Sequence, residues 1–300
     1  MEILNYSPIF VPNMKFNFNY QTMKAYIGVD LGGTNIRAGR VMDDMIEEQN
    51  QVRTPKDAKD EWATVEAIKD VIRAVMNDRV EAIGIGVPSV VDREKGIVYN
   101  VTNIPHWEEV HLKKALEKEF DMPVYLDNDA NCFALAERYM GVGRDFEHFV
   151  GLTIGTGIGG GIIQQGKLLQ DANCGSGEFG ELPYKDQNVQ YYASGSFFSN
   201  VYGVDGGEMY RRAKRQDPEA LEAYRQMGKY LGETVKIIVL TLDPQMIVFG
   251  GTVAEAHSFF EEALYENLQD FLFPTSIKNL KLFFTELEHP AILGAASLCY

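Results

Sequence analysis

The hydrophobic and polar positions along this chain predict short strands that alternate with amphipathic helices. An apolar run ends in the glycine-rich segment VDLGGTN at 29–35, and further apolar runs follow at 36–41 and 46–52, with a polar connection at 42–44. Apolar runs on both sides of a glycine-rich turn are typical of a β-hairpin. The chain is therefore expected to begin with a three-stranded antiparallel meander.

Two helices and two further strands are expected after the meander. Residues 62–76 repeat apolar positions at the spacing of one helix face, and 82–88 is a short apolar run that ends at a proline. A second helix is expected around 112–120 and a last strand at 123–126. The first lobe is therefore predicted as β-β-β-α-β-α-β.

The same order of elements recurs in the second half of the chain. Apolar runs at 149–154 and 158–163 flank a second glycine-rich segment, LTIGTGIGG at 152–160. The remaining elements are expected as helices at 130–140, 220–242 and 255–271 and as strands at 245–249 and 280–284. The repetition predicts a duplicated α/β fold, with two lobes and a cleft between them.

These elements also suggest the lobe boundaries. The N-terminal lobe is expected at 24–126, after a flexible extension at 1–23. The C-terminal lobe is expected at 127–289, with an insertion at 171–202. A last helix at about 290–300 is expected to pack back on the N-terminal lobe.

Composition and charge narrow the class of protein. The 300 residues are 45% hydrophobic, which suits two cores, because single cores stop growing near this length. The formal charge of −15 opposes nonspecific binding to nucleic acid and favours small-molecule chemistry. No apolar stretch approaches the roughly 20 residues of a membrane span, so no membrane partner is expected. Cys132, Cys174 and Cys299 are too scattered for a disulfide framework, and a cytoplasmic location fits best.

The two glycine-rich turns carry the first functional signal. Backbone N–H groups in such turns can approach an anion, and two turns in one chain suggest two lobes that hold one polyphosphate. The second turn also fits the dinucleotide fingerprint G-x-G-x-x-G, but a strand rather than a helix is expected after it, which disfavours a dinucleotide site. The sequence contains no P-loop motif. Ordinary glycine hairpins are the alternative.

Two aspartates beside predicted turns are candidates for chemistry. Asp30 is suited to hold a hydrated Mg²⁺ that bridges phosphate oxygens, and a turn-capping aspartate is its alternative. Asp129 lies between Asn128 and Asn131, whose neutral amides leave one carboxylate to accept a proton. The alternative is a helix N-cap, a role for which Asp129 or its neighbour is placed.

Two loop segments contain side chains that can bind sugar hydroxyls. Asn103 carries an amide that both donates and accepts hydrogen bonds, although its Asn-x-Pro sequence is commonly a surface turn. Glu178 and Glu181 lie in the glycine-lined segment GEFGE at 177–181, where carboxylates either bind hydroxyls or face solvent.

Five motifs in order make the chain resemble the ROK family of sugar kinases and repressors, within the actin-like ATPase and hexokinase superfamily. The motifs are DLGGTNIR at 30–37, GIGVPSVVD at 84–92 with Ser89 where the family has glycine, NIPHW at 103–107, NDAN at 128–131 and VFGG at 248–251. The resemblance runs from about residue 24 to the C-terminus. It implies a two-lobed actin-like, ribonuclease H-like fold and a homodimer, because relatives commonly pair.

The resemblance also implies an activity. It is the transfer of a phosphoryl group from ATP to a hexose or N-acetylhexosamine, commonly at the 6-hydroxyl, with Asp129 as general base and Asp30 holding Mg²⁺ through the ATP phosphates. The implied ATP-binding positions are Asp30, Gly32, Gly33, Thr34, Asn35, Gly155, Thr156, Gly157, Gly250 and Gly251. The implied sugar-binding positions are Ser89, Asn103, Asn128, Asp129, Glu178 and Gln190.

The sequence departs from the family pattern on the sugar side. Glu181 replaces a histidine, Gln190 replaces a glutamate ahead of ASG at 193–195, and the zinc cluster is missing between Leu182 and Tyr191, so no structural zinc is expected. A sugar-binding protein without turnover is one alternative function. A DNA-binding regulator is another, which the negative charge and the roughly 23 residues ahead of the first strand disfavour.

Overall fold

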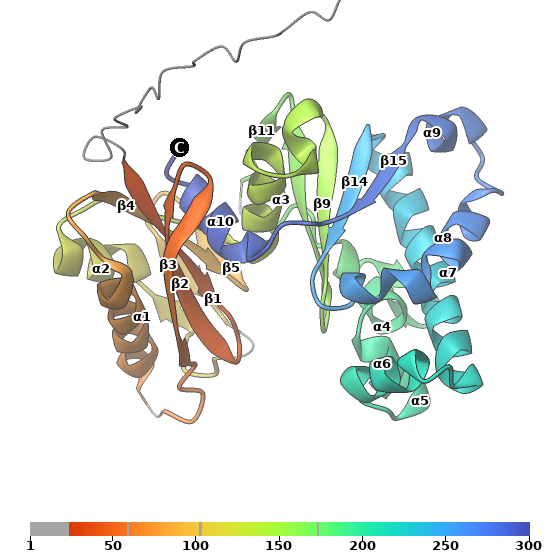
Figure 1. Ribbon diagram of the computed structural model, residues 1–300, viewed down its shortest axis with the longest axis horizontal. Helices are drawn as coiled ribbons and strands as arrows, with labels where there is room; N and C mark the ends of the chain where they lie inside the picture. Colours follow the sequence, from red (N-terminus) through yellow and green to blue (C-terminus); the bar gives the residue numbers. More distant parts are fainter. Residues whose placement is uncertain (1–23, 59, 102–103, 173) are drawn as a thin grey trace, which may run out of the picture.

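The computed structural model describes residues 24–58, 60–101, 104–172 and 174–300, which form two lobes, each built on a five-stranded sheet (Figure 1). The expected extension at 1–23 lies outside the described residues. The strand order is β3-β2-β1-β4-β8 in one sheet and β11-β10-β9-β14-β15 in the other. In both sheets the first three strands are antiparallel and the last two join in parallel. The duplicated α/β fold predicted from the repeated pattern is confirmed.

The N-terminal lobe contains the meander that the sequence predicts and a small sheet that it does not. Its elements are β1 (Ala25–Leu31), β2 (Asn35–Met42), β3 (Met45–Arg53), α1 (Glu61–Val75), β4 (Val80–Val87), β5 (Val90–Asp92), β6 (Ile97–Tyr99), β7 (Glu109–Val110), α2 (Leu112–Phe120), β8 (Val124–Asn128) and, from the end of the chain, α10 (Pro290–Ser297). Strands β5, β6 and β7 pair into a separate sheet. They have only two or three residues each, too few for a period of two to be visible.

The C-terminal lobe repeats the sheet and adds helices after it. Its elements are α3 (Asp129–Tyr139), η2 (Val142–Asp145), β9 (Phe149–Ile154), β10 (Ile158–Gln164), β11 (Lys167–Leu168), η3 (Phe179–Glu181), β12 (Pro183–Tyr184), β13 (Gln187–Asn188), α4 (Val189–Ala193), α5 (Ser196–Tyr202), α6 (Gly206–Lys214), α7 (Pro218–Leu242), β14 (Met246–Gly250), η4 (Ala254–Phe259), α8 (Glu261–Leu268), α9 (Pro274–Asn279) and β15 (Lys281–Phe284).

The single helix expected at 255–271 is wrong. The segment is a 3₁₀ helix, η4, followed by the separate helix α8. The break falls at Phe260, whose φ of −132° is not helical. Phe260 is buried against α7, where a Cβ on Gly228 would lie 2.4 Å from the Phe260 carbonyl oxygen. Tertiary packing of this aromatic residue therefore overrides the apolar periodicity.

Helices α3 and α10 lie side by side between the two sheets (Figure 1). Helix α3 packs on β9 and β10, and α10 packs on β1 and β4. The two helices touch through their backbones, because a Cβ on Gly294 of α10 would lie 1.7 Å from the carbonyl oxygen of Cys132 in α3. The last helix of the chain therefore fixes the position of α3 between the lobes.

Glycines on the strands allow α10 to approach the first sheet equally closely. A Cβ on Gly28 of β1 would lie 1.9 Å from the carbonyl oxygen of Ile292, and a Cβ on Gly84 of β4 would lie 1.8 Å from that of Ala295. Real Cβ atoms do not approach this closely, so any larger residue would force the helix away from the sheet. These glycines are needed for close approach rather than for a turn.

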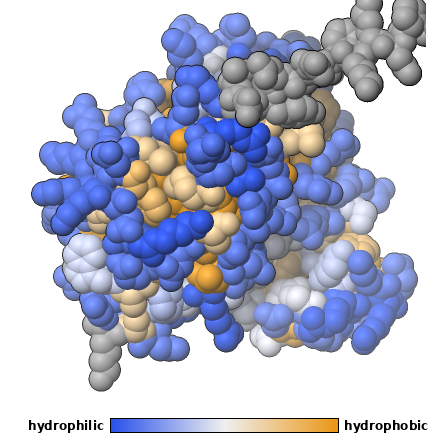
Figure 2. Space-filling model, turned by 60° about the vertical axis from the view of Figure 1, so that its left-hand side comes forward, coloured by the Kyte–Doolittle hydropathy of each residue, from blue (hydrophilic) through white to orange (hydrophobic). Residues whose placement is uncertain are grey.

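Each lobe has its own hydrophobic core, as two lobes of this length require. The face that carries the N-terminal lobe is covered mainly by hydrophilic side chains, with a limited hydrophobic group near its centre (Figure 2). Among the described residues, no helix combines the length and the apolar character that crossing a lipid bilayer requires. The three cysteines are free thiols.

Gly294→Ala should destabilise the protein although alanine is the better helix former. We expect a loss of more than about 2 kcal/mol in the free energy of unfolding, because the added methyl group would collide with the α3 backbone. The matched control is Gly206→Ala in α6, where the nearest atom lies 3.7 Å from the added Cβ and the change should be neutral or slightly stabilising. Denaturant unfolding measures both, and equal effects would contradict the backbone contact.

Candidate active site

The first glycine-rich turn joins β1 to β2 and is held by a threonine from a distant segment. Gly32 closes the turn by donating its N–H to the Asn35 carbonyl at 3.1 Å. Thr54, which is 5% exposed, donates its hydroxyl to the Gly32 carbonyl at 2.7 Å and its N–H to the Thr34 carbonyl at 2.9 Å. The turn is thereby fixed from the β3 side. Sequence reasoning missed Thr54 because it belongs to no motif and acts from 22 residues beyond Gly32.

The second glycine-rich turn joins β9 to β10 and is held by the segment between α4 and α5. The Gly195 N–H donates to the Gly155 carbonyl at 2.8 Å. The hydroxyls of Ser194 and Ser196 both donate to the Thr156 carbonyl, at 2.7 and 2.5 Å. The two turns thus occupy equivalent places in the two sheets, and each is supported by hydroxyl donors from outside its hairpin.

The junction between β8 and α3 places Asp129 at the first position of the helix. Asn128 is the N-cap, and its side-chain oxygen accepts the Ala130 N–H at 2.8 Å. Asp127, which is 3% exposed, accepts the Asn128 N–H at 2.7 Å and the Asn131 side-chain amide at 2.8 Å. The sequence left open whether Asp129 or its neighbour caps the helix, and the structure assigns the cap to Asn128.

The carboxyl group of Asp129 interacts electrostatically with two others, those of Asp30 and Glu178. The pKa of Asp129 is raised to about 7, first because the surrounding protein removes solvent from its carboxyl group, although the residue as a whole is exposed, and then by the charges of Asp30 and Glu178. Burial also raises the pKa of Asp30, which Arg37 opposes through an ion pair at 3.3 Å. The pKa of Glu178, an exposed residue, is raised first by the loss of solvent on the side that faces the protein and then by the charge of Glu181. A carboxyl that titrates near neutrality and lies beside two others is suited to proton transfer next to a bound cation.

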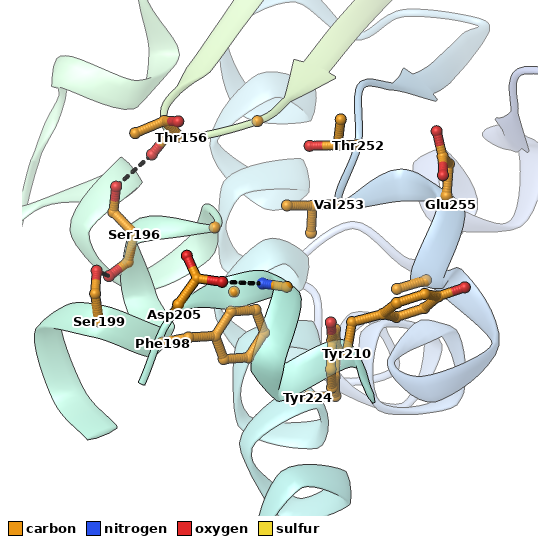
Figure 3. Close-up of a pocket in the computed structure, with 15 residues that line it drawn as sticks. Thr156, Ser196, Phe198, Ser199, Asp205, Tyr210, Tyr224, Thr252, Val253 and Glu255 are labelled. Atoms are coloured by element: carbon orange, nitrogen blue, oxygen red, sulfur yellow. Dashed lines mark hydrogen bonds between the residues drawn. The ribbon is translucent and has the colours of Figure 1, made fainter. Parts of the chain in front are cut away.

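A cavity of about 460 Å³ lies below the second glycine-rich turn (Figure 3). Thr156 and Ser196 lie on one side of it and Thr252 and Glu255 on the other, above aromatic rings. The lining residues are Gly155, Thr156, Gly195, Ser196, Phe198, Ser199, Asp205, Gly206, Gly207, Tyr210, Tyr224, Thr252, Val253, Glu255 and Ala256. Apolar walls with a few hydroxyl and carboxyl groups suit a flat base joined to a ribose. Sequence reasoning identified only Gly155 and Thr156 of this set, because helices α5 and α6 carry no recognisable motif.

A second cavity connects this pocket to the N-terminal lobe. Its volume is about 1150 Å³, and its lining includes Asp30, Arg37 and Gly251. Thr252 and Glu255 line both cavities. A ligand that is anchored in the first cavity therefore has a path toward Asp30. Arg37, a cation on this path, was not selected from the sequence as a site residue.

The residues predicted to bind a sugar fall into two groups. The Asn128 side-chain amide donates to the Ser89 carbonyl at 3.4 Å. These two residues therefore lie together, next to Asp129 in the chain. Gln190 donates its amide N–H to Glu181 at 2.5 Å, and its oxygen accepts the Ile158 N–H at 3.4 Å beside the second turn. Asn103 lies outside the described residues.

The two departures from the family pattern, Glu181 and Gln190, are therefore hydrogen-bonded to each other. Asn188 also donates to the Glu181 carboxylate, at 3.1 Å. Within the described ranges, no group of three or more His, Cys, Asp or Glu side chains is arranged to hold a metal ion.

Comparison with protein-family models identifies the family of this chain. The model of the ROK family matches residues 26–300. The chain belongs to the ROK family. A glucokinase from Thermotoga maritima is 30% identical over 307 aligned residues, which cover 91% of this chain and 96% of that enzyme.

Solved structures of ROK proteins have the same fold. A ROK hexokinase from Thermus thermophilus is 31% identical, with a TM-score of 0.75 over 91% of this chain and 97% of that one. A ROK glucokinase from Streptomyces griseus, in complex with glucose and AMPPNP, is 26% identical, with a TM-score of 0.79 over 91% of this chain and 98% of that one. The actin-like fold that the resemblance implied is therefore confirmed.

Asp129→Asn should raise the melting temperature, and by more at pH 8 than at pH 5. The pKa of Asp129 lies near 7 in the folded protein, against about 3.9 in an unfolded chain, so the folded state binds this proton more tightly. The protonated carboxyl group stabilises the folded state at low pH, and this stabilisation is lost as the pH rises from about 4 through about 7. Asparagine does not ionise, so the variant does not lose it. Thermal unfolding at several pH values measures the difference, with Asp121→Asn, an exposed aspartate after α2, as control. A gain that does not change with pH would contradict the raised pKa.

Proposed function

We propose that this ROK protein is an ATP-dependent sugar kinase that phosphorylates the 6-hydroxyl of a hexose or an N-acetylhexosamine. The observation that carries the proposal is the position of Asp129, at the start of α3 with a pKa of about 7, in electrostatic contact with Asp30 and Glu178. The relatives named glucokinase and N-acetyl-D-glucosamine kinase support a sugar as the acceptor. A primary hydroxyl is the least hindered nucleophile of such a sugar.

We place the nucleoside of ATP in the cavity of about 460 Å³ and its phosphates along the connected path toward Asp30. The turns at 32–34 and 155–157 would then approach the phosphates from the two lobes. Gly251, which has a φ of +85°, lines the second cavity just before Thr252, which lines both, and lets the backbone turn there without a side chain. The glycines would serve a ligand that needs close backbone contact.

The residues present fit a Mg²⁺ ion that is bound mainly through phosphates. Asp30 supplies a hard oxygen ligand whose ionisation burial disfavours, so a nearby divalent cation would stabilise its carboxylate. Magnesium ions commonly use one or two carboxylates together with substrate phosphates. When bound, the ion would neutralise charge that develops on the transferred phosphoryl group.

Asp129 would accept the proton of the attacking hydroxyl. Phosphoryl transfer requires positioning and charge neutralisation more than covalent catalysis, so a single base beside the acceptor is sufficient. Asn128 and Ser89 would orient the sugar from the N-terminal lobe, and Glu178 and Gln190 from the C-terminal lobe. Asn103, which lies outside the described residues, stays a predicted sugar ligand. A closed arrangement of the lobes would exclude water and limit the hydrolysis of ATP.

Sugar-dependent release of ADP tests the proposed function directly. Glucose, mannose, fructose, N-acetylglucosamine and N-acetylmannosamine are supplied separately with ATP and Mg²⁺, and at least one should raise ADP release well above the sugar-free rate. The product of the best substrate is then analysed by NMR for the phosphorylated carbon. If no sugar raises ADP release but one binds in calorimetry, the protein is a sugar-binding ROK protein without turnover.

Asp129→Asn should lower kcat by at least about 100-fold, because asparagine cannot accept the hydroxyl proton. ATP affinity, measured by calorimetry or nucleotide fluorescence, should change little, since Asp129 lines neither cavity assigned to ATP. Asp121→Asn again serves as the control. Turnover within a few-fold of the wild type would remove Asp129 from the role of base.

Activity should fall on the acid side of neutrality. The base must be ionised to accept a proton, and the pKa of Asp129 in the ligand-free protein is about 7. With both substrates below saturation and Mg²⁺ in excess, kcat/KM should fall about tenfold per pH unit below this value. A profile that stays flat from pH 5.5 to 8 would show that no group with this pKa must lose a proton.

A further inference from the structure

Arg93 contacts carboxylates from both lobes. It follows β5 in the N-terminal lobe, and its Nε donates to Oδ2 of Asp127 at 2.9 Å while Nη1 donates to Oδ1 of Asp171 at 2.7 Å. Asp127 lies on β8, two residues before Asp129, whereas Asp171 follows β11 in the C-terminal lobe. One guanidinium group therefore connects the two lobes through carboxylates that are close in sequence to Asp129 and Glu178.

Asp127 connects Arg93 to the junction between β8 and α3, where the proposed base Asp129 lies. Its side chain is 4% exposed, and its Oδ1 accepts hydrogen bonds from the Asn128 N–H and the Asn131 amide, on either side of Asp129. The Cys174 thiol donates to the same oxygen at 3.3 Å. A buried carboxylate with this many donors has one orientation, and it sets the path of the chain around Asp129.

Asp171 makes the equivalent connection to the segment that carries Glu178. Its Oδ1 accepts the Cys174 N–H at 3.2 Å, and its Oδ2 accepts the Ser176 N–H at 2.8 Å. Ser176 lies two residues before Glu178. The Asp171 carboxylate thus holds the backbone that leads directly to the proposed sugar-binding glutamate.

We propose that Arg93 is a positioning residue. It couples the segment that carries Glu178 to the β8–α3 junction that carries Asp129, so that a sugar bound by Glu178 also orients Asp129. This inference rests on the proposed sugar kinase activity. A planar guanidinium can donate in two directions at fixed geometry, which a lysine ammonium on a flexible stem cannot reproduce. Without Arg93, the buried Asp127 carboxylate would lose its cation and the two segments would lose their common partner.

Kinetics of Arg93→Gln and Arg93→Lys test the coupling. We expect kcat to fall at least tenfold and the KM for sugar to rise at least fivefold in Arg93→Gln, with a partial effect in Arg93→Lys, which retains the positive charge. The KM for ATP should stay within twofold in both variants, because Arg93 lines neither ATP cavity. This split between the two substrates is not expected from a general loss of stability.

Arg212 provides a control for the loss of an arginine that pairs with two carboxylates. It also pairs with two carboxylates, Asp217 at 2.8 Å and Glu219 at 2.5 Å, and its side chain is 24% exposed against 22% for Arg93. The carboxylates that Arg212 pairs with are 31% and 62% exposed, against 4% and 11% for those of Arg93, so Arg212→Gln should cost less stability than Arg93→Gln. It should leave kcat and both KM values unchanged.

Alkylation of Cys174 gives a readout that does not depend on turnover. The thiol is 4% exposed, and burial and then Asp127 raise its pKa to about 11, so it should react slowly in the wild type. Each of the three cysteines falls in a different tryptic peptide, and mass spectrometry can follow Cys174 alone. Arg93 itself lowers the pKa of the Cys174 thiol, so the loss of its charge alone would slow alkylation, and only greater exposure of the thiol would speed it. Iodoacetamide should nevertheless label Cys174 at least tenfold faster in Arg93→Gln than in the wild type and in Arg212→Gln, because the segment loses its anchor, and glucose should slow the labelling of the wild type.

The outcomes separate this inference from the proposed function. If the wild type phosphorylates a sugar but Arg93→Gln keeps kcat and the sugar KM within twofold, the coupling is wrong and the kinase assignment stands. If the wild type phosphorylates none of the sugars, the proposed function fails. Unchanged Cys174 labelling in Arg93→Gln would in addition overturn the connection that Arg93 makes between the two segments. Equal kinetic losses in Arg93→Gln and Arg212→Gln would reduce Arg93 to a structural role.

Discussion

The backbone contact between α3 and α10 is the constraint on which the rest of this structure depends. Gly294 allows the two helices to touch, and Gly28 and Gly84 allow α10 to lie directly on the first sheet. Asp30 stands near the end of β1 and Asp129 at the start of α3. The position of each aspartate relative to the other is therefore set by a stack of closely packed backbones, which is stiffer than contacts between long side chains.

This rigid stack holds together carboxyl groups that repel one another. The charges of Asp30 and Glu178 both raise the pKa of Asp129, and Glu181 raises that of Glu178, while Arg37 offsets part of the charge at Asp30. A site of this kind reduces the stability of the ligand-free fold, which the two cores and the helix stack must compensate. The same repulsion favours a ligand that brings divalent positive charge. The repulsion among these carboxyl groups would therefore favour the metal-bound phosphate group that the proposed function requires.

Local patterns predicted the repeated sheets, both glycine-rich turns and the long helix α7, because hydrophobic periodicity and turn residues act over a few positions. They did not predict the sheet formed by β5, β6 and β7, whose strands are too short, or the break at Phe260, which depends on packing against Gly228. The proposed nucleoside cavity was mostly missed because α5 and α6 contribute to it by position alone. Thr54 was missed for the same reason, since its role exists only when β3 pairs beside the first turn.

Glu181 and Gln190, the two departures from the family pattern, form one linked change, because their side chains are hydrogen-bonded to each other. Gln190 donates to Glu181 and accepts from the Ile158 N–H, and its oxygen would lie 2.5 Å from a Cβ on Gly157. A glutamate at 190 would place a second carboxylate against Glu181, so the amide relieves a repulsion that the acidic residue at 181 creates. Both the nitrogen and the oxygen of the Gln190 side-chain amide are then used within the protein, which supports the second turn. We therefore expect these substitutions to change which sugar is preferred, through Glu178 and its neighbours, while the two turns keep the geometry that phosphate binding requires.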